Sequence, residues 1–225
     1  MSRLSVHLWR RALIFANGDN NNGPMVQRAL SMSENTVIVA ADGGARVARY
    51  FGLRVDVVIG DMDSLSALEL ESLQADGAKI MRHPEEKNET DLELALTWVV
   101  EQGIRRIRII GAVGDRLDQT LSNIYLLALP ILDDCDVRMS AGKQEAWLVK
   151  PGTTLIEGVP GDTISLIPLN GTVHGVTTEN LYYPLVDEDL RFGPARGVSN
   201  VMKTESARVT VREGVLLVVH TVGRA

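Results

Sequence analysis

The stretch Val57-Val-Ile-Gly-Asp-Met-Asp-Ser64 joins a short apolar run directly to two carboxylates, Asp61 and Asp63. A β-branched run that ends in glycine and acidic residues is typical of a buried strand followed by a turn. In open α/β sheets, ligands bind in the crevice outside the carboxyl ends of the strands. The stretch therefore predicts an α/β fold and also the edge of the sheet that carries the site.

Comparable runs on both sides of this stretch alternate with amphipathic segments up to about residue 150. Ser66-Ala-Leu-Glu69 and Thr90-Asp-Leu-Glu93 match a capping box, in which a hydroxyl and a carboxylate satisfy the free amides of a helix start. We expect an α/β domain over residues 1–145, with a mainly parallel sheet flanked by helices. The expected strands are Ala12–Ala16, Thr36–Ala40, Asp56–Gly60, Ile107–Ile110 and Asp136–Ser140.

The helical pattern disappears from about Pro151 onward, and turn signals divide the rest of the chain into short extended pieces. Residues 207–212 alternate between apolar and polar, and Glu213-Gly214 leads from them into the apolar run 215–219. We expect these two pieces to form a hairpin. Residues 150–225 are therefore predicted to form a smaller all-β sandwich domain. The turn signals are Pro151-Gly152, Pro160-Gly161, Asn170-Gly171 and Glu213-Gly214.

Composition limits the partners and the compartment. The 225 residues are 45% hydrophobic, which is enough for an ordinary globular core. Acidic and basic residues are mixed along the chain at a net charge of -6, so no basic block is available for nucleic acid or a membrane surface. Cys135 is the only cysteine, which excludes an internal disulfide framework. Because the apolar segment Ala12–Ala16 is also too short for an export signal, we expect a cytoplasmic protein.

Acidic residues follow several of the predicted strands. Asp42 ends one strand, Asp61 and Asp63 end a second, Asp91 opens a capped helix and Asp118 follows a further strand. Two carboxylates about 5 Å apart repel by about 3 kcal/mol at an effective dielectric near 20, so a partly dry site needs a compensating cation. Oxygen ligands at a site that also handles phosphates favour Mg²⁺.

Each of these residues also has a simpler explanation. Asp91 could be a first-turn carboxylate that favours the helix dipole, and Asp118 could be the N-cap of the next helix. Gly43-Gly44 could make a tight turn between a strand and a helix. Lys87 and Arg116 could be ordinary surface charges, although each flanks an acidic strand end where phosphate oxygens would need donors.

Six short motifs along the chain are informative when they are taken together and in order. They are Ala41–Ala45, Gly60–Ser64, Glu86–Glu93, Gly111–Gln119 with Asn123 one helical turn later, Thr178–Leu185 and Gly197–Asn200. In this order they resemble the thiamine diphosphokinase (thiamine pyrophosphokinase) family, and the resemblance covers nearly the whole chain.

The resemblance implies an ATP-binding catalytic domain followed by a thiamine-binding β-sandwich. The expected reaction transfers the diphosphate group of ATP to the hydroxyl of thiamine and releases AMP. The expected assembly is a homodimer with shared active sites. Mg²⁺ would be held by Asp61, Asp63 and Asp91, with Asp42 nearby as a metal or water-shell partner. Gly43-Gly44 would let the backbone approach ATP.

The resemblance also implies roles for cationic and aromatic side chains. Lys87 and Arg116 would hold the phosphates, and Asp118 would either orient Arg116 or accept the proton of the thiamine hydroxyl. Tyr183 would offer an aromatic face to a thiamine ring, unless it packs in the core of the sandwich. Ser199 and Asn200 would supply directional hydrogen bonds to thiamine.

Three positions depart from the family's usual pattern. Asn88 stands where aspartate is frequent, Asp115 where glycine is frequent, and Gln119 where histidine is frequent. Gln119 donates hydrogen bonds but does not titrate near neutral pH, so a proton transfer through histidine is excluded there. Asp115 adds a negative charge to a turn expected near phosphate.

Two other functions are compatible with the same acidic motifs. One is a diphosphokinase for another hydroxymethyl heterocycle such as a pterin, which would have no evident need for the segments around Tyr183 and Ser199. The other is a protein that binds thiamine or nucleotide without turnover. The intact residues Asp61, Asp63, Asp91 and Arg116 argue against it.

Overall fold

The computed structural model describes residues 9–31 and 35–224, and the chain divides into two compact units, Met1–Ala141 and Gly142–Ala225. The sequence-based boundary between residues 145 and 150 lies slightly later, in strand β7 (Gln144–Val149). Within the described residues, no helix has both the length and the hydrophobicity needed to cross a bilayer.

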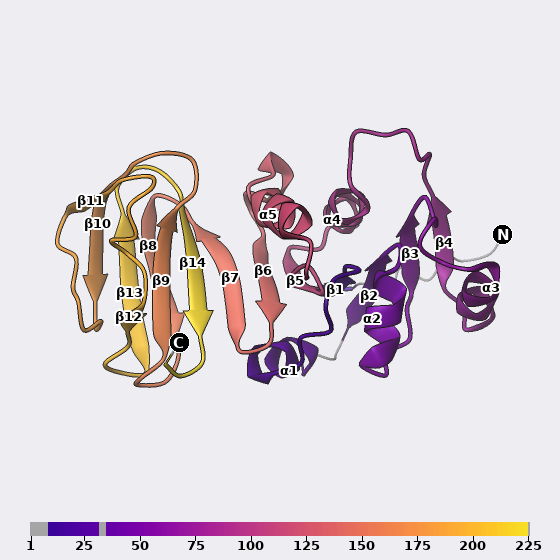
Figure 1. Ribbon diagram of the computed structural model, residues 1–225, viewed down its shortest axis with the longest axis horizontal. Helices are drawn as coiled ribbons and strands as arrows, with labels where there is room; N and C mark the ends of the chain where they lie inside the picture. The colour runs from indigo at the N-terminus through magenta and orange to yellow at the C-terminus, as the bar shows by residue number, and fades with distance from the viewer. Residues whose placement is uncertain (1–8, 32–34, 225) are drawn as a thin grey trace. The chain divides into compact units, whose positions relative to one another are not determined.

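The described strands of the first unit lie side by side, and every pairing described among them is parallel. Their order is β6-β5-β1-β2-β3-β4 (Figure 1). A sheet of this kind aligns the carboxyl ends of all its strands at one edge. The strands are β1 (Arg11–Phe15), β2 (Thr36–Ala41), β3 (Val57–Gly60), β4 (Lys79–Arg82), β5 (Arg106–Ile110) and β6 (Asp136–Ala141).

Helices cover both faces of this sheet, which explains the continuous apolar runs of its central strands. One core joins alternate strand residues, such as Phe15, Ala40 and Val58, to the buried faces of α1, α2 and α3. The opposite face is covered by α4, which buries Ala95, Leu96 and further residues. The helices are α1 (Pro24–Leu30), α2 (Gly44–Tyr50), α3 (Ala67–Ala75), α4 (Asp91–Glu101), α5 (Leu117–Leu126) and the 3₁₀ turn η1 (Pro130–Leu132).

The five strands expected in this unit are all present, with ends that shift by one residue. The edge strand β4 is not among the predicted strands, because Lys79–Arg82 has only two apolar residues, Ile80 and Met81, between two charged ones. Ser66 and Glu69 form the predicted capping box at α3. At α4, the Thr90 hydroxyl accepts a hydrogen bond from the Glu93 amide at 3.2 Å, so this helix also begins where its sequence predicts.

The described part of the second unit is all-β, and its strands from β7 onward belong to two sheets within which they pair antiparallel. In one sheet their order is β12-β9-β14-β7, and in the other it is β11-β10-β13-β8. Buried residues from both sheets, including Leu166, Val209 and Leu216, form a single core, which confirms the predicted sandwich. The other strands are β8 (Gly152–Glu157), β9 (Thr163–Pro168), β10 (Val173–Glu179), β11 (Glu188–Leu190), β12 (Asn200–Val201), β13 (Ser206–Val211) and β14 (Leu216–Thr221).

The predicted hairpin between residues 207–212 and 215–219 is wrong. Both segments are strands, but β13 pairs with β8 and β10, whereas β14 pairs with β7 and β9 in the other sheet. The backbone amides of Arg212 and Glu213 both donate to the carbonyl of His174, which extends the pairing of β10 with β13 instead of turning the chain back. Gly214, at φ +98, then carries the chain across to β14 in the other sheet.

A buried aspartate and a buried histidine are hydrogen-bonded to each other in the second unit. Asp162 contacts His220 at 2.8 Å, and both side chains are at most 5% exposed. The same carboxylate accepts hydrogen bonds from the amides of Val159 and Gly223. Burial acts to raise the pKa of Asp162, but these hydrogen bonds and His220 lower it overall. The charged carboxylate therefore stabilises the fold.

We predict that Asp162→Asn will lower the free energy of unfolding by about 3 kcal/mol, because it breaks a buried pair and leaves one amide without its acceptor. Asp189→Asn is the matched control, since Asp189 also binds a histidine and a backbone amide but is half exposed. It should have little effect. Urea unfolding followed by circular dichroism measures both.

The pH dependence of the same variant has a defined sign. Because the folded-state pKa of Asp162 is lowered, its contribution is present above the unfolded-state pKa of about 3.9 and is lost as the pH falls through the folded value. The stability difference between wild type and Asp162→Asn should therefore shrink in strong acid. A difference that stays constant to the lowest pH at which the chain folds would contradict this account.

Candidate active site

A cavity of about 420 Å³ opens at the carboxyl ends of the parallel strands, where the sequence places the site. Its volume falls in the range of roughly 300–1,000 Å³ that is usual for ligand sites. The wall combines residues that follow strands β1, β2, β3 and β5 with the start of α4 and the first turns of α5. These are mainly Asn17, Gly18, Asp42, Asp61, Asp63, Ser64, Lys87, Asp91, Asp115, Arg116, Gln119 and Asn123.

Three carboxylates meet in this cavity. Oxygen atoms of Asp42, Asp61 and Asp91 all lie within 4.8 Å of one another, the one such group among the described residues. They come from the ends of β2 and β3 and from the first turn of α4. The approach depends on Gly60, because a Cβ there would lie 2.8 Å from Asp91 Cγ and 3.0 Å from Asp42 Cβ.

Lys87 compensates the charge of this group. Its ammonium lies 2.9 Å from Asp61 Oδ2 and 3.1 Å from Asp91 Oδ1, and its side chain is 12% exposed. The hydrogen bond from Lys87 lowers the pKa of Asp61, whereas burial raises the pKa of Asp91. Burial also acts to lower the pKa of Lys87, but the two carboxylates raise it overall. The ammonium therefore stays charged and occupies the place where a metal cation could balance the carboxylates.

The donor atoms of the group fit a hard cation. Asp42 is 4% exposed, and its Oδ1 is buried without a hydrogen-bond partner among the described residues. Asp91 Oδ1 is likewise buried and has the ion pair with Lys87 but no hydrogen bond of good geometry in the described structure. Buried carboxylate oxygens without donors are costly unless a cation satisfies them. Residues Asp42, Asp61 and Asp91 could therefore hold a divalent ion.

Other residues expected at the cation and nucleotide sites lie at different depths. Asp63 is exposed on the wall of the same cavity, outside the three-carboxylate group. Gly43 and Gly44 are buried, and the wall formed by the described residues does not include them. A Cβ at Gly44 would lie 1.9 Å from the Phe15 carbonyl, so this glycine is required for the packing of α2 against β1.

Arg116 and Asp118 form an exposed pair at the start of α5. Arg116 Nη2 lies 2.6 Å from Asp118 Oδ2, and each side chain is 67% exposed. The N-cap of α5 is Arg116, so the alternative that Asp118 caps this helix is wrong. Arg116, Asp115 and Gln119 belong to the cavity wall, whereas Asp118 is not among its described residues.

A smaller recess of about 130 Å³ lies in the second unit and brings together the residues expected to bind thiamine. Tyr183 is 65% exposed beside it, so the alternative that this ring packs in the sandwich core is wrong. Asn200 is buried and holds Tyr183 through both of its backbone groups, at 3.0 Å and 2.6 Å. Ser199 is exposed in a left-handed conformation, at φ +61.

Sequence reasoning missed several residues of the main cavity. Asn17 and Gly18 directly follow β1, and the carboxyl-edge rule applied to that strand would have found them. Glu85 and Glu89 line the cavity from the loop before α4, where no periodicity marks them. Arg46 lies outside the wall formed by the described residues but contacts Ser64, which belongs to it.

The fold and the site together define a class: a two-unit protein whose parallel-sheet unit carries a site suited to a cation and an anionic ligand. Two family models match the chain. The model for "Thiamin pyrophosphokinase, catalytic domain" matches residues 29–139, and that for "Thiamin pyrophosphokinase, vitamin B1 binding domain" matches residues 153–216. The matches cover well over half of the sequence, and the chain belongs to the thiamine pyrophosphokinase family.

Individual relatives agree with this assignment. The chain is 26% identical to the thiamine pyrophosphokinase of Bacillus subtilis over 189 residues, which are 84% of this chain and 88% of the relative. The crystal structure of the B. subtilis enzyme superposes with a TM-score of 0.84, covering 94% of this chain and 99% of the other. For the thiamin pyrophosphokinase of Geobacillus thermodenitrificans, the TM-score is 0.81 at 27% identity, with 94% and 97% covered.

We predict that Lys87→Met will destabilise the chain by about 1–2 kcal/mol without metal, because three clustered carboxylates lose their compensating charge. Added MgCl₂ should then raise its melting temperature more than that of wild type, since the cation meets no competing ammonium. Lys79→Met, at an exposed lysine of β4, is the control. Equal metal-free stability of the Lys87 and Lys79 variants, with equal gains on MgCl₂, would contradict the charge-compensation account.

Proposed function

We propose that this chain is a thiamine pyrophosphokinase that transfers the diphosphate group of ATP to the hydroxyl of thiamine, giving thiamine diphosphate and AMP. The observation that carries the proposal is the match of both units to domains of one family, together with the acidic cavity at the sheet edge. Transfers of phosphoryl groups need little covalent help from protein. Positioning and charge stabilisation are what the residues of this cavity can supply.

The cation of this reaction is proposed to be Mg²⁺, because carboxylate ligands beside phosphates favour it. Asp61 and Asp91 are proposed ligands, and Asp42 joins them because its buried Oδ1 lacks a hydrogen-bond donor in the described structure. Asp63 is proposed as a further ligand from the exposed wall. Bound Mg²⁺ would spread the negative charge that develops on the phosphate oxygens.

Lys87 and Arg116 are proposed to hold the phosphates. The ammonium of Lys87 contacts the carboxylates of Asp61 and Asp91. A metal cation bound to these carboxylates would replace the ammonium, which could then contact an anionic ligand. Arg116 lines the cavity and presents a planar set of donors suited to phosphate. These two cations and the bound metal would act on the same charged groups.

Asp118 is proposed to orient Arg116 and not to act as the general base. The hydrogen bond from Arg116 lowers the pKa of Asp118, which makes this carboxylate a weaker base. Its side chain also lies outside the wall formed by the described residues of the cavity. Both observations favour the role of orienting Arg116 over the role of accepting the proton of the thiamine hydroxyl.

The active form is proposed to be a cytoplasmic homodimer with shared active sites, in which residues 1–145 bind ATP and residues 150–225 bind thiamine. The recess beside Tyr183, at about 130 Å³, is smaller than the roughly 300 Å³ at which ligand sites begin. It covers only part of a molecule the size of thiamine, so another surface must complete it. In a twofold dimer, each subunit can supply that surface to the recess of the other.

The pterin alternative is less well supported than thiamine. The match of residues 153–216 to a vitamin B1 binding domain gives the second unit a purpose that a pterin enzyme would not need. The group of three carboxylates favours turnover over binding alone, because a cation held there would stabilise the charge that develops during phosphoryl transfer.

The proposed reaction predicts AMP, not ADP, as the nucleotide product when the chain is given ATP, MgCl₂ and thiamine. A hydroxymethyl pterin should be a poor acceptor in the same assay. Asp61→Asn should lower turnover at least about 100-fold, because it removes a ligand from the charge-stabilising cation. Chromatography of the nucleotides measures all three. ADP formation, or a preference for the pterin, would refute the assignment.

Shared active sites predict complementation between two inactive chains. Asp61→Asn is altered only in the first unit, and the double variant Tyr183→Ala with Ser199→Ala only in the second. Coexpressed, the two chains should form mixed dimers with one intact site and recover about half of the wild-type turnover per mixed dimer. The control coexpresses Asp61→Asn with Asp91→Asn, both altered in the first unit, which should recover none. Purified mixed dimers no more active than this control would rule out sharing.

A further inference from the structure

The loop that carries two of the acidic residues has an unfavourable backbone. It runs from Asp61 to Ser64, between β3 and α3, and Met62 within it has φ +68. A non-glycine residue keeps this left-handed conformation only when surrounding contacts fix it. The Met62 side chain is 5% exposed in the core of the first unit, which anchors the middle of the loop. Its far end, at Ser64, needs a separate anchor.

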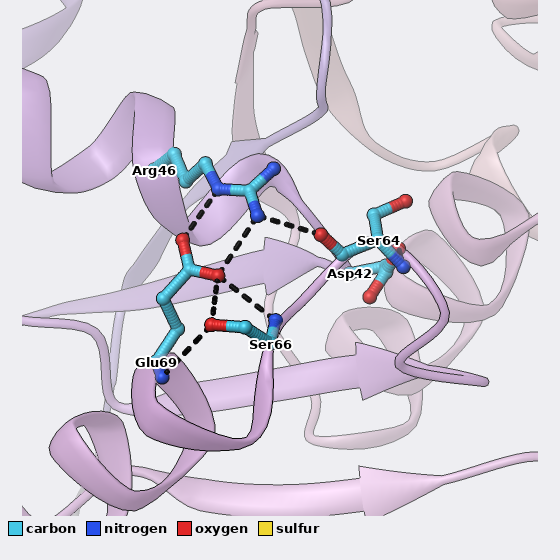
Figure 2. Close-up of polar contacts among 5 residues, drawn as sticks. All are labelled: Asp42, Arg46, Ser64, Ser66 and Glu69. Carbon is cyan, nitrogen blue, oxygen red and sulfur yellow. Dashed lines mark hydrogen bonds and ion pairs between the residues drawn. The ribbon is translucent and has the colours of Figure 1, made fainter.

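Both backbone groups of Ser64 are held by the segment that follows β2. The Ser64 amide donates to Asp42 Oδ2 at 3.1 Å, and the Ser64 carbonyl accepts from Arg46 Nη2 at 2.7 Å (Figure 2). The first contact occupies one oxygen of Asp42 and leaves the buried Oδ1 as the atom without a hydrogen bond among the described residues. The position of Ser64 therefore decides which oxygen of Asp42 is available to a cation.

Arg46 is itself fixed by the capping box of α3. Its Nε and Nη2 donate to the two oxygens of Glu69, at 2.5 Å and 2.8 Å, as Figure 2 shows. Glu69 also accepts from the amide and hydroxyl of Ser66, at 2.8 Å and 2.7 Å. The hydrogen bond from Arg46, followed by those from Ser66, lowers the pKa of Glu69, so the carboxylate stays ionised.

We propose that Arg46 is a positioning residue for the cation site, which fixes Ser64 and through it Asp42 and the loop of Asp61. This inference rests on the proposed function, and it assigns to Arg46 no contact with the cation or a substrate. The Arg46 side chain is 51% exposed, and an exposed ion pair contributes little to stability. Its loss should therefore appear in cation affinity and not in the melting temperature.

The chain contains a matched control on the same helix. Arg49, one turn after Arg46, donates to Ser72 at 2.9 Å and to Asp76 at 2.8 Å. Both arginines thus join α2 to α3, but Arg46 alone of the two contacts the loop. Arg46→Lys is the conservative variant, because it keeps the positive charge. Its ammonium lacks the planar set of donors that binds Glu69 and Ser64 together.

The test compares wild type, Arg46→Ala, Arg46→Lys and Arg49→Ala in the full chain. Calorimetric titration with MnCl₂ alone measures cation affinity without turnover. Steady-state AMP formation at increasing MgCl₂ separates the half-saturating concentration from kcat, and thermal melts without metal report folding. Arg46→Ala should weaken Mn²⁺ binding about 10-fold, as changes behind a metal ligand typically do. Its half-saturating MgCl₂ should rise similarly, with kcat largely recovered at saturation.

Arg46→Lys should bind Mn²⁺ with an affinity between those of wild type and Arg46→Ala, and Arg49→Ala should match wild type. The melting temperatures of the two alanine variants should agree. In a chain that forms AMP, equal Mn²⁺ affinities of Arg46→Ala and Arg49→Ala would overturn this inference alone. A lower melting temperature of Arg46→Ala that accounts for its weaker binding would also overturn it. Failure of the wild-type chain to form AMP would instead overturn the proposed function.

Discussion

The repulsion among three carboxylates is the constraint on which the rest of the first unit depends. Asp42, Asp61 and Asp91 lie within 4.8 Å of one another, where each pair repels by about 3 kcal/mol at an effective dielectric near 20. The parallel sheet makes this density possible, because it aligns the ends of β2 and β3 beside the start of α4. The carboxylates can stay this close without metal because the ammonium of Lys87 lies beside two of them.

The backbone around this group is adapted to the same crowding. Gly60 removes the one side chain that would separate Asp42 from Asp91, and Gly44 lets α2 approach the Phe15 carbonyl. Asp42 and Met62 both adopt left-handed conformations, at φ +42 and +68. Each such residue costs about 1 kcal/mol or more, which the surrounding core must offset. The buried strands β1 to β3 provide that rigid surrounding.

Sequence patterns predicted the strands, the edge of the sheet and most of the cavity, because those follow from hydrophobic period and parallel topology. They pointed to Asp42, Asp61, Asp63 and Asp91, but not to which three of the four would share one point. Asp61 and Asp63 flank Met62, which has a left-handed backbone; Asp61 joins the group with Asp42, whereas Asp63 is exposed. The link between β13 and β14 also escaped prediction, because a turn and a crossover between sheets share the same signal at Gly214.

The two cationic side chains of the proposed phosphate site differ in how firmly carboxylates hold them. Lys87 and Arg116, the two side chains proposed to hold phosphates, each pair with a carboxylate in the described structure. At Arg116 the pair is two-thirds exposed on both sides, so solvent screens it and the arginine can exchange Asp118 for a phosphate at little cost. At Lys87 the pair is mostly buried, so exchange requires another positive charge among the carboxylates. In the proposed site, release of Lys87 would therefore accompany cation binding, whereas release of Arg116 would not need it.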